Sequence, residues 1–456
     1  MLSRRSFIKN TGLAGAGILM SGPAYDFFHI RKKTSVIIIG AGLSGLAAAY
    51  SLRKKNIDFI ILEARKRIGG RVFSYTIDPL NDLNIELGAE WVGASHQRIL
   101  TLCEENRLKL ENNQFDTHLI YRGKYYKNNE WSYSEAWDKK FKQLLKDYSQ
   151  LNEVDKKELD AMDWWRYLVD NGCEGRDLDL RELLDSTDFG ESIRHVSAFA
   201  AMSEYAESSE KNEMDFKIRG GNSLLPESMA DKIGREKIKL NHTVQKIGQG
   251  SANGKVQVSC TNGQVFEADK IICTLPTFAT KKILWEPGLP SDKLHALNEL
   301  QYARINKNPL LFSRRFWKEE NFDMITDTSA HYFYHATKNQ SSEKGVLISY
   351  TVGDKADVVS RQSGGWREDT VQLSLQPAFG NIRPMLEKQV NYYWGEDEYS
   401  RGSYALYGPG QWFRLMPIFK APFLNTFFAG EHLADWQGFM EGAINTGEAA
   451  ADLVLI

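Results

Sequence analysis

Cysteine and histidine are scarce in this chain, and their spacing does not suit metal binding. The sequence has 4 cysteines without a C-x-x-C pair, and its 9 histidines form no metal-ligand pair on a predicted helix. We therefore expect no metal site. Cys260 and Cys273 lie in successive strand-like segments, where packing as small apolar residues is favoured over a disulfide.

The sequence also has no excess of charge of either sign. Its 57 lysines and arginines nearly balance 59 aspartates and glutamates, which gives a formal net charge of −2. Such a balance creates no basic field, so we expect no nucleic acid partner. With 456 residues, of which 42% are hydrophobic, the chain can bury a large core and is long enough for about two or three domains.

The first residues, MLSRRSFIKNTGLAGAGILMSG, contain Arg4-Arg5 followed by a mildly apolar, glycine-rich run. This segment resembles a twin-arginine export signal. The apolar part from Thr11 to Met20 is too short to span a bilayer as a helix. We therefore expect residues 1–33 to direct the folded protein through the twin-arginine export machinery to the periplasm. A disordered basic tail is the alternative, and an uncleaved signal acting as a membrane anchor stays open.

A strand, a glycine turn and a helix are predicted from Val36 onward. Val36 to Ile39 is apolar at every position, which is typical of a parallel strand covered on both faces. The turn GAGLSG follows at once, and the segment from Leu43 to about Lys54 has strong helix propensity. Gly40 suits a tight turn, Gly42 lets the backbone approach a pyrophosphate, and Gly45 lets the helix pack closely on the strand.

The next predicted strand, Phe59 to Leu62, ends at an acidic residue. Glu63 can accept hydrogen bonds from a ribose diol, and it disfavours a 2′-phosphate. Arg65 and the run Gly69-Gly70-Arg71 then add two cations and a second bare stretch of backbone for diphosphate oxygens. Together these features predict a buried dinucleotide, and the second cluster favours a flavin over a nicotinamide. For the glycine pattern alone, an ordinary loop is the alternative.

Three separated segments resemble the flavin-containing amine oxidase family, with the monoamine oxidases as the nearest pattern. They are LEARKRIGGR after the glycine turn, ELGAEWVG at Glu86 to Gly93, and FFAGEHLADWQGFMEGAINTGEAAA near the end. The segments occur in the family's order, and the resemblance covers most of the chain from Ser35 onward. It implies an α/β fold with a Rossmann-like FAD-binding domain and an α+β substrate-binding domain.

The chain is expected to pass between the two domains more than once. We expect the FAD-binding domain in residues 34–100, 215–287 and 391–456, and the substrate-binding domain in residues 101–214 and 288–390. Helices are predicted from Gln97 to about Leu108 and within residues 135–169, and strands around turns at Asn253-Gly254 and Asn262-Gly263. Trp164 and Trp165 are expected either in the core or on the substrate cavity.

The resemblance implies further cofactor-binding residues. They are Gly88, Ala89, Glu90, Val244, Trp394, Gly430, Glu431 and Met440. A helix is expected to begin at Met440 with its positive N-terminal end toward the flavin. The alternative interpretation of Val244 is an ordinary strand residue, and that of Glu431 is a residue that caps a neighbouring loop.

The resemblance also implies three catalytic residues. Lys307, nine residues before Phe316, matches a lysine whose ammonium holds a water against flavin N5, with a surface lysine as the alternative. Tyr404 and Phe439 match two rings that form a cage for the amine, and aromatic faces suit an amine. The family usually has tyrosine where Phe439 stands. Ser403 occupies the position of the cysteine that is bonded to the flavin in monoamine oxidases, so we expect noncovalent FAD.

These parts predict the oxidation of a primary, aromatic or apolar amine to an imine. Water would hydrolyse the imine to an aldehyde and ammonia, and oxygen would be reduced to hydrogen peroxide. A flavin dehydrogenase that uses another electron acceptor, a desaturase or isomerase, and a non-catalytic flavoprotein are the alternatives. A homodimer stays open.

An L-amino acid oxidase is the alternative closest in chemistry, and it needs a cation to hold the α-carboxylate. No arginine closely follows the glycine of ELGAEWVG, and Arg98 is assigned to the following helix. Other candidates for the cation are Arg304, Arg314 and Arg414. A polyamine substrate would require acidic residues along the cavity, which the sequence does not assign.

Overall fold

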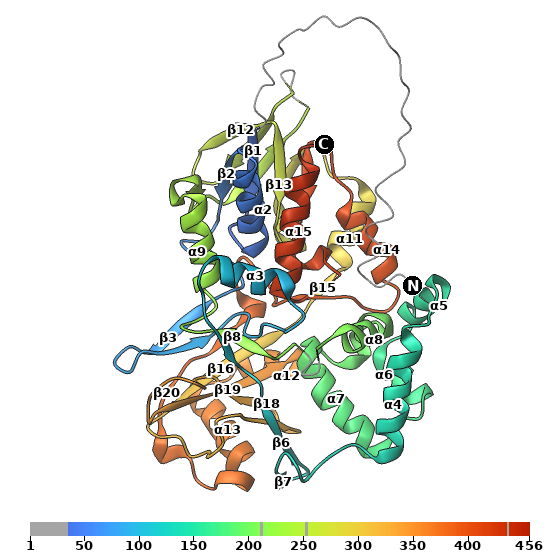
Figure 1. Cartoon of the computed structure of the whole chain (residues 1–456), viewed down its shortest axis with the longest axis vertical. Helices are drawn as coiled ribbons and strands as arrows, with labels where there is room; N and C mark the ends of the chain where they lie inside the picture. Colours follow the sequence, from blue (N-terminus) through green and yellow to red (C-terminus); the bar gives the residue numbers. More distant parts are fainter. Residues whose placement is uncertain (1–34, 210–212, 251–253, 436) are drawn as a thin grey trace, which may run out of the picture.

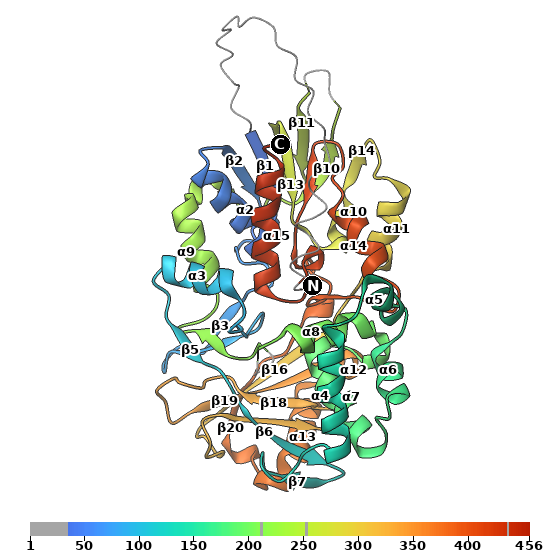
Figure 2. The same ribbon diagram turned by 45° about the vertical axis from the view of Figure 1, so that its right-hand side comes forward.

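The computed structural model describes residues 35–209, 213–250, 254–435 and 437–456. The expected export signal at residues 1–33 and Asn253 of one expected turn lie outside the described residues. Figures 1 and 2 show a molecule in two parts, with a parallel sheet and its helices at one end and a larger sheet flanked by helices at the other.

A parallel sheet contains the predicted strand and glycine turn. Its strand order is β23-β13-β1-β2-β9. The central strand β1 is buried from Val36 to Ile39, as predicted from its apolar run. The strands are β1 (Ser35–Ile39), β2 (Asp58–Leu62), β9 (Ile238–Lys239), β13 (Lys270–Cys273) and β23 (Thr426–Phe428).

Two helices that are distant in sequence pack side by side on this sheet (Figure 1). They are α2 (Leu43–Lys54), which has the predicted bounds, and α15 (Met440–Leu453). Small residues allow their close approach, since a Cβ atom on Gly447 would lie 2.1 Å from the carbonyl oxygen of Ser44. The last helix of the chain is therefore held against α2, the first described helix.

A four-stranded sheet of order β12-β11-β10-β14 adjoins the parallel sheet. Its hairpin between β11 and β12 turns at Asn262-Gly263, as predicted, and Gly263 has a φ of +83°. The strands are β10 (Val244–Gly248), β11 (Val256–Cys260), β12 (Val265–Ala268) and β14 (Leu284–Glu286). Helices in this part are α3 (Gln97–Glu105), α9 (Leu224–Ile233), α10 (Thr277–Lys282), α11 (Ser291–Glu299) and α14 (Trp412–Lys420).

The other end of the molecule contains an eight-stranded sheet. The strand order is β20-β16-β19-β18-β17-β6-β7, and β21 also pairs with β16. Strands β16, β17, β18 and β19 are buried along their whole length. The strands are β6 (Asp116–Tyr121), β7 (Lys124–Tyr126), β16 (Ile305–Phe312), β17 (Phe322–Thr326), β18 (Tyr332–His335), β19 (Gly345–Val352), β20 (Leu386–Gln389) and β21 (Tyr392–Tyr393).

Helices flank this sheet and include a group from the middle of the chain (Figure 2). The segment predicted as helical between residues 135 and 169 forms three separate helices, because turns interrupt it after Tyr148 and Asp160. The helices are α4 (Glu135–Tyr148), α5 (Glu153–Asp160), α6 (Trp164–Asp170), α7 (Gly175–Phe189), α8 (Ala198–Glu207), α12 (Gly353–Arg361) and α13 (Gly364–Phe379).

Short strand pairs connect the two parts. They are β3 (Ser74–Asp78) with β4 (Leu83–Glu86), β5 (Leu110–Asn112) with β8 (Phe216–Ile218), and β15 (Gln301–Tyr302) with β22 (Ala405–Leu406). All 4 cysteines are buried with free thiols. Among the described residues, no helix is both long enough and apolar enough to cross a membrane.

Candidate functional site

One cavity of about 730 Å³ extends from the glycine turn to the eight-stranded sheet. It is lined by every residue predicted for the site except Gly45. Gly45 lies beneath the turn, where a Cβ atom would be 1.9 Å from the carbonyl oxygen of Gly40. This contact is the close helix packing that the sequence predicted for the third glycine.

The glycine turn provides an open cradle at one end of the cavity. Gly40 has a φ of +103°, which side chains other than glycine rarely adopt. A Cβ atom on Gly42 would have no protein atom within 4 Å, so the space beside this backbone is free for a ligand. The buried hydroxyl of Ser44 has no hydrogen-bond partner among the described residues. The cradle and the N-terminus of α2 therefore fit a pyrophosphate group.

Glu63 lies next to this cradle at the end of β2. Its carboxylate accepts hydrogen bonds from the backbone N–H groups of Ala41 at 2.7 Å and Arg65 at 2.8 Å. Burial raises the pKa of the Glu63 carboxyl above its usual range. Val244, the first residue of β10, lines the same end of the cavity. This end has the acid and the apolar wall that a nucleoside requires.

The two predicted arginines both line the cavity, and both are held by protein groups. Arg65 donates to Asp397 at 2.9 Å and to Ser400 at 2.9 Å. Arg71 donates to the backbone carbonyl of Ser403 at 2.5 Å and to Glu431 at 2.7 Å. Whether either arginine also reaches a diphosphate stays a prediction.

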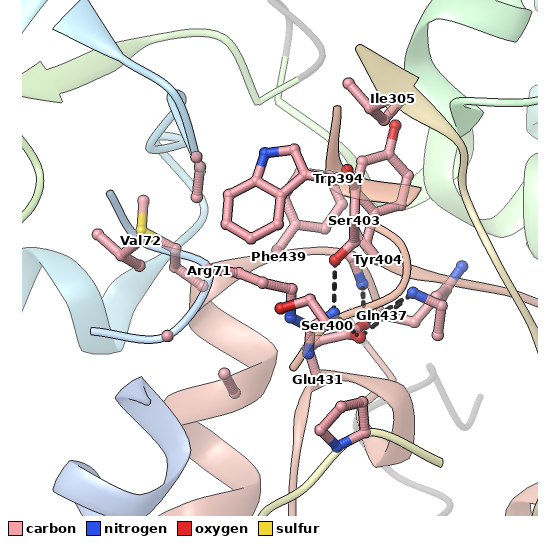
Figure 3. Close-up of a pocket in the computed structure, with 18 of the residues that line it drawn as sticks. Arg71, Val72, Ile305, Trp394, Ser400, Ser403, Tyr404, Glu431, Gln437 and Phe439 are labelled. Atoms are coloured by element: carbon pink, nitrogen blue, oxygen red, sulfur yellow. Dashed lines mark hydrogen bonds and ion pairs between the residues drawn. The ribbon is translucent and has the colours of Figure 1, made fainter. Parts of the chain in front are cut away.

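Glu431 is a buried carboxylate that joins three segments of the site (Figure 3). Besides Arg71, it accepts from the backbone N–H groups of Ala405 at 3.2 Å and Gly438 at 2.9 Å. Burial alone would raise the pKa of Glu431, but the charge of Arg71 holds it below its usual range. Glu431 therefore fixes the chain next to Tyr404 and next to Phe439.

Lys307 is buried on β16, so the alternative interpretation of a surface lysine is wrong. Its ammonium donates to the carbonyls of Glu86 at 3.0 Å and Gly88 at 2.8 Å, and to the Glu90 carboxylate at 3.4 Å. Burial lowers the pKa of Lys307. Its three N–H donors thus fix the segment from Glu86 to Glu90 against the sheet, on the wall of the cavity.

Three predicted aromatic residues surround the middle of the cavity (Figure 3). Trp394 donates from its indole nitrogen to the carbonyl of Leu87 at 2.7 Å. Tyr404 donates to the carbonyl of Asp188 at 2.9 Å. Phe439 precedes the first residue of α15, Met440, which also lines the cavity. The structure therefore brings together rings that are separated by up to 45 residues in sequence.

Ser403 also lines this part of the cavity. Its hydroxyl is buried and has no hydrogen-bond partner among the described residues. A polar atom that lacks a partner in a cavity wall suits a polar ligand. This hydroxyl and the glycine cradle are two independent features that fit a dinucleotide cofactor.

The arginines named as candidates for holding a carboxylate do not line the cavity. Arg304 pairs with Glu191 and Asp357, and Arg414 pairs with Glu299. The cavity does contain Arg181, which the sequence analysis did not single out, and this guanidinium pairs with Asp185. Each of the three arginines on the cavity wall, among the described residues, is thus already paired with a carboxylate.

Several residues at the far end of the cavity were also missed by sequence reasoning. They are Thr117, Tyr133, Asp185, Asp188, Asp323, Tyr332 and Tyr350. A detectable signal existed for Asp323 alone, because it is a charged residue inside the apolar strand FDMIT. Trp164 and Trp165, for which a cavity position was one alternative, do not line the cavity, and Trp164 is fully buried in the core.

Comparison with known proteins identifies the family of this chain. The model of the flavin-containing amine oxidoreductase family matches residues 43–455. The chain is 26% identical to flavin-containing amine oxidase A of Canis lupus familiaris, over 93% of this chain and 87% of that protein. It is 28% identical to the L-amino acid oxidase bordonein-L of Crotalus durissus terrificus, over 91% of this chain and 86% of that protein.

Solved structures show the same fold. A putrescine oxidase matches with a TM-score of 0.82 and 23% identity, over 93% of this chain and 99% of that chain. The cyclohexylamine oxidase of Brevibacterium oxydans matches with a TM-score of 0.82 and 21% identity, over 92% of this chain and 98% of that chain. These matches confirm the α/β fold expected from the sequence. The match of the family model over residues 43–455 establishes that this chain belongs to the flavin-containing amine oxidoreductase family.

Proposed function

We propose that this protein binds FAD without a covalent bond and oxidises a primary amine with oxygen, forming an aldehyde, ammonia and hydrogen peroxide. The observation that carries the proposal is a single cavity that begins at a dinucleotide cradle and contains Lys307, Tyr404 and Phe439. An apolar or aromatic group next to the amine suits the rings around its middle.

The chemistry is divided between the cofactor and the protein. FAD held in the glycine cradle of Gly40 and Gly42 would supply the redox chemistry, which is acceptance of a hydride equivalent from the α-carbon of the amine and transfer of the electrons to oxygen. Tyr404 and Phe439 orient the neutral amine, and the buried walls exclude water from the reacting atoms. Lys307 supplies a positive charge in a dry site, where charge has a large effect. Water then hydrolyses the released imine.

Noncovalent binding is supported by Ser403, because a serine hydroxyl cannot form the thioether that a cysteine forms. We expect acid precipitation of the purified protein to release the yellow cofactor into the supernatant. Yellow colour that stays with the precipitated protein would refute noncovalent binding.

An L-amino acid oxidase is the second candidate, since relatives with this activity are as similar as amine oxidases. An amino acid needs a cation for its α-carboxylate. The arginines on the cavity wall are paired with Asp397, Glu431 and Asp185, which favours an amine.

An anaerobic screen of amines and L-amino acids tests the proposal. Primary amines should bleach the flavin absorbance of the holoprotein, and admission of air should restore it with formation of peroxide. Bleaching by L-amino acids alone would favour the second candidate. Bleaching without reoxidation by air would indicate a dehydrogenase with another electron acceptor. A flavin that no amine or amino acid bleaches would contradict both activities.

We also propose that the protein is exported to the periplasm through the twin-arginine pathway. The proposal is supported by Arg4-Arg5 in the segment SRRSFIK and by the apolar run that follows. Replacement of both arginines by lysine should leave the protein in the cytoplasm, as measured by cell fractionation. Unchanged export of this variant would contradict the proposal.

A further inference from the structure

One face of the eight-stranded sheet forms the far wall of the cavity. Residues directly opposite each other in paired strands share a face. Lys307 on β16 is opposite Tyr350 on β19, and Tyr350 is opposite Tyr332 on β18. Tyr332 is opposite Ile325 on β17, two residues after Asp323, so Asp323 points to this face as well. Each of these residues lines the cavity.

Asp323 is a buried carboxylate with an unused oxygen. It is 1% exposed. Its Oδ2 atom accepts hydrogen bonds from the hydroxyls of Tyr332 at 2.7 Å and Thr117 at 3.3 Å. Its Oδ1 atom has no hydrogen-bond partner among the described residues. A buried carboxylate without a cation is costly, so such a group on a cavity wall suits a cationic ligand.

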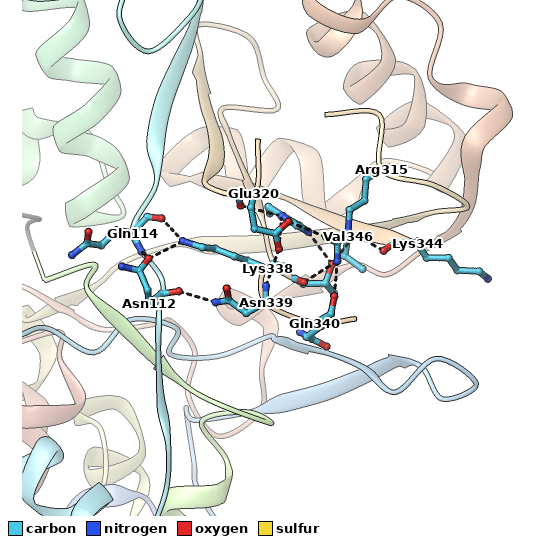
Figure 4. Close-up of polar contacts among 12 residues, drawn as sticks. Asn112, Gln114, Arg315, Glu320, Lys338, Asn339, Gln340, Lys344 and Val346 are labelled. Carbon is cyan, nitrogen blue, oxygen red and sulfur yellow. Dashed lines mark hydrogen bonds and ion pairs between the residues drawn. The ribbon is translucent and has the colours of Figure 1, made fainter. Parts of the chain in front are cut away.

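Among the described residues, no lysine or arginine forms an ion pair with Asp323. Lys338 is the lysine whose charge acts on Asp323, but its ammonium donates to the Asn112 side chain at 2.9 Å and to the carbonyl of Gln114 at 2.5 Å. Figure 4 shows Lys338 directed to these two residues. A second charged group that acts on Asp323 is Asp116, which is also negative. The carboxylate of Asp323 is therefore left for a cation from outside the chain.

A depression outside the cavity lies next to Asp323. Thr117 and Tyr133 line both this depression and the cavity. Its described lining includes Asp116, Glu135 and Asp138, and no lysine or arginine. Asp138 is paired with Lys142, whereas Asp116 and Glu135 form no ion pair among the described residues. An acidic depression of this kind attracts cationic molecules to the surface next to Asp323.

We propose that Asp323 binds a second cationic group of the substrate, so that one amine of a long diamine or polyamine is oxidised while Asp323 holds the other. The proposal rests on the proposed function and adds to it the class of amine. Lys307 and Asp323 lie on strands separated by three strand spacings, or about 14 Å. A substrate that reaches both ends of this wall must therefore be long, with an apolar chain between its two cations.

The test compares diamines with monoamines of equal length on the holoenzyme. Diaminobutane, diaminohexane, diaminooctane and diaminodecane are each paired with the corresponding alkylamine, and kcat/KM is measured for each. A longer diamine should exceed its monoamine. In Asp323→Asn, which keeps the shape of the side chain, kcat/KM for that diamine should fall by roughly thirty-fold or more, the cost of removing one partner of a buried charge pair. The value for the monoamine should change by less than about three-fold.

Asp160→Asn is the matched control. Asp160 is also a buried carboxylate that accepts a hydroxyl hydrogen bond, from Ser197 at 2.6 Å, but it does not line the cavity. This variant should leave the ratio of diamine to monoamine kcat/KM unchanged. Oxidation of monoamines with no advantage for any diamine, or equal losses for both classes in Asp323→Asn, would overturn the proposal and leave the proposed function intact. Failure of all amines to bleach the flavin would instead overturn the proposed function.

The wild-type protein provides a second test that needs no variant. Burial raises the pKa of Asp323 to about 7. Its neighbours on the adjacent elements are Tyr332, Thr117, Asp116 and Lys338. As pH rises through about 7, Asp323 loses its proton, so the ratio of diamine to monoamine kcat/KM should increase. Taking this ratio cancels the effect of pH on the reacting amine, because both substrates carry such an amine. A ratio that does not change between pH 6 and pH 8 would contradict a role for Asp323.

Discussion

Lys307 is one of several buried lysines in the described chain, and its surroundings distinguish it from the others. Lys217, Lys293 and Lys338 are also buried, but only Lys307 lines the cavity. Lys293 has similar bonding, because its ammonium donates to the carbonyls of Ile418, Phe419 and Ala421. Burial and hydrogen bonding are therefore similar for Lys307 and Lys293. Only the position of Lys307 on the cavity wall supports a chemical role for it.

Replacement of Lys307 tests this distinction. In Lys307→Met, reoxidation of the reduced enzyme by oxygen should slow by about a hundred-fold, because the site loses its preorganised positive charge. Reduction by the amine should slow much less. The two half-reactions are measured separately by stopped-flow absorbance. Lys293→Met, which removes a buried ammonium outside the cavity, should lose stability without a change in the oxygen reaction. Equal slowing of both half-reactions in Lys307→Met would remove the proposed role.

At the scale of elements, the unit formed by β1, the glycine turn and α2 follows from local sequence. Two of its glycines, Gly45 and Gly42, have different structural roles. A Cβ atom on Gly45 would lie 1.9 Å from a backbone oxygen of the turn, whereas a Cβ atom on Gly42 would enter the open cavity. Gly42 has a φ of −74°, which alanine also adopts. One glycine is thus required for packing, and the other leaves room for the ligand.

The two alanine variants should therefore differ. Gly45→Ala should lower the free energy of unfolding of the protein without cofactor by about 1–3 kcal/mol, the range for overpacking. Gly42→Ala should change this free energy by less than about 1 kcal/mol. It should nevertheless weaken FAD binding, because its methyl group occupies the cradle. Denaturant unfolding and titration of FAD fluorescence measure the two quantities. Loss of FAD affinity in proportion to lost stability in both variants would contradict this division.

Most helices and strands around the glycine turn could be predicted from the sequence, but their relative positions in space could not. The sequence predicted α2 with its observed bounds, because alanine-rich periodicity and the flanking glycines are local signals. The helical pattern from Glu135 to Val169 did not reveal its two interruptions, because those turns lack glycine and proline. The neighbouring position of α15 and α2 depends on small residues from both ends of the chain, and these give no local signal.

At the scale of the whole molecule, the cavity lies between the parallel sheet and the eight-stranded sheet, and both contribute to its walls. Lys307 joins the two parts directly, because it comes from β16 and binds the carbonyls of Glu86 and Gly88. Trp394 makes a similar connection to Leu87. A ligand that fills this cavity would contact both parts at once.

FAD should therefore stabilise the whole protein. A ligand present at one hundred times its dissociation constant adds about 2.7 kcal/mol to the free energy of unfolding. Addition of FAD to the protein without cofactor should raise Tm, as measured by thermal unfolding monitored by tryptophan fluorescence. Gly42→Ala should show a smaller shift at the same FAD concentration. The absence of a shift in the wild-type protein would contradict the cofactor assignment.

The sequence by itself determined the parts of this protein whose chemistry is contained in consecutive residues. A tight turn, a bare backbone and a helix N-terminus follow from GAGLSG alone, because glycine conformation is a local property. Only the tertiary structure placed Asp323 beside Thr117 and Tyr332, and this pair of contacts depends on the pairing of β17 with β6 and β18. Strand pairing brings together residues that are distant in the chain. The sequence therefore marks Asp323 only as a charged residue in an apolar strand, and it shows neither the contacts of its carboxylate nor the cavity that it faces.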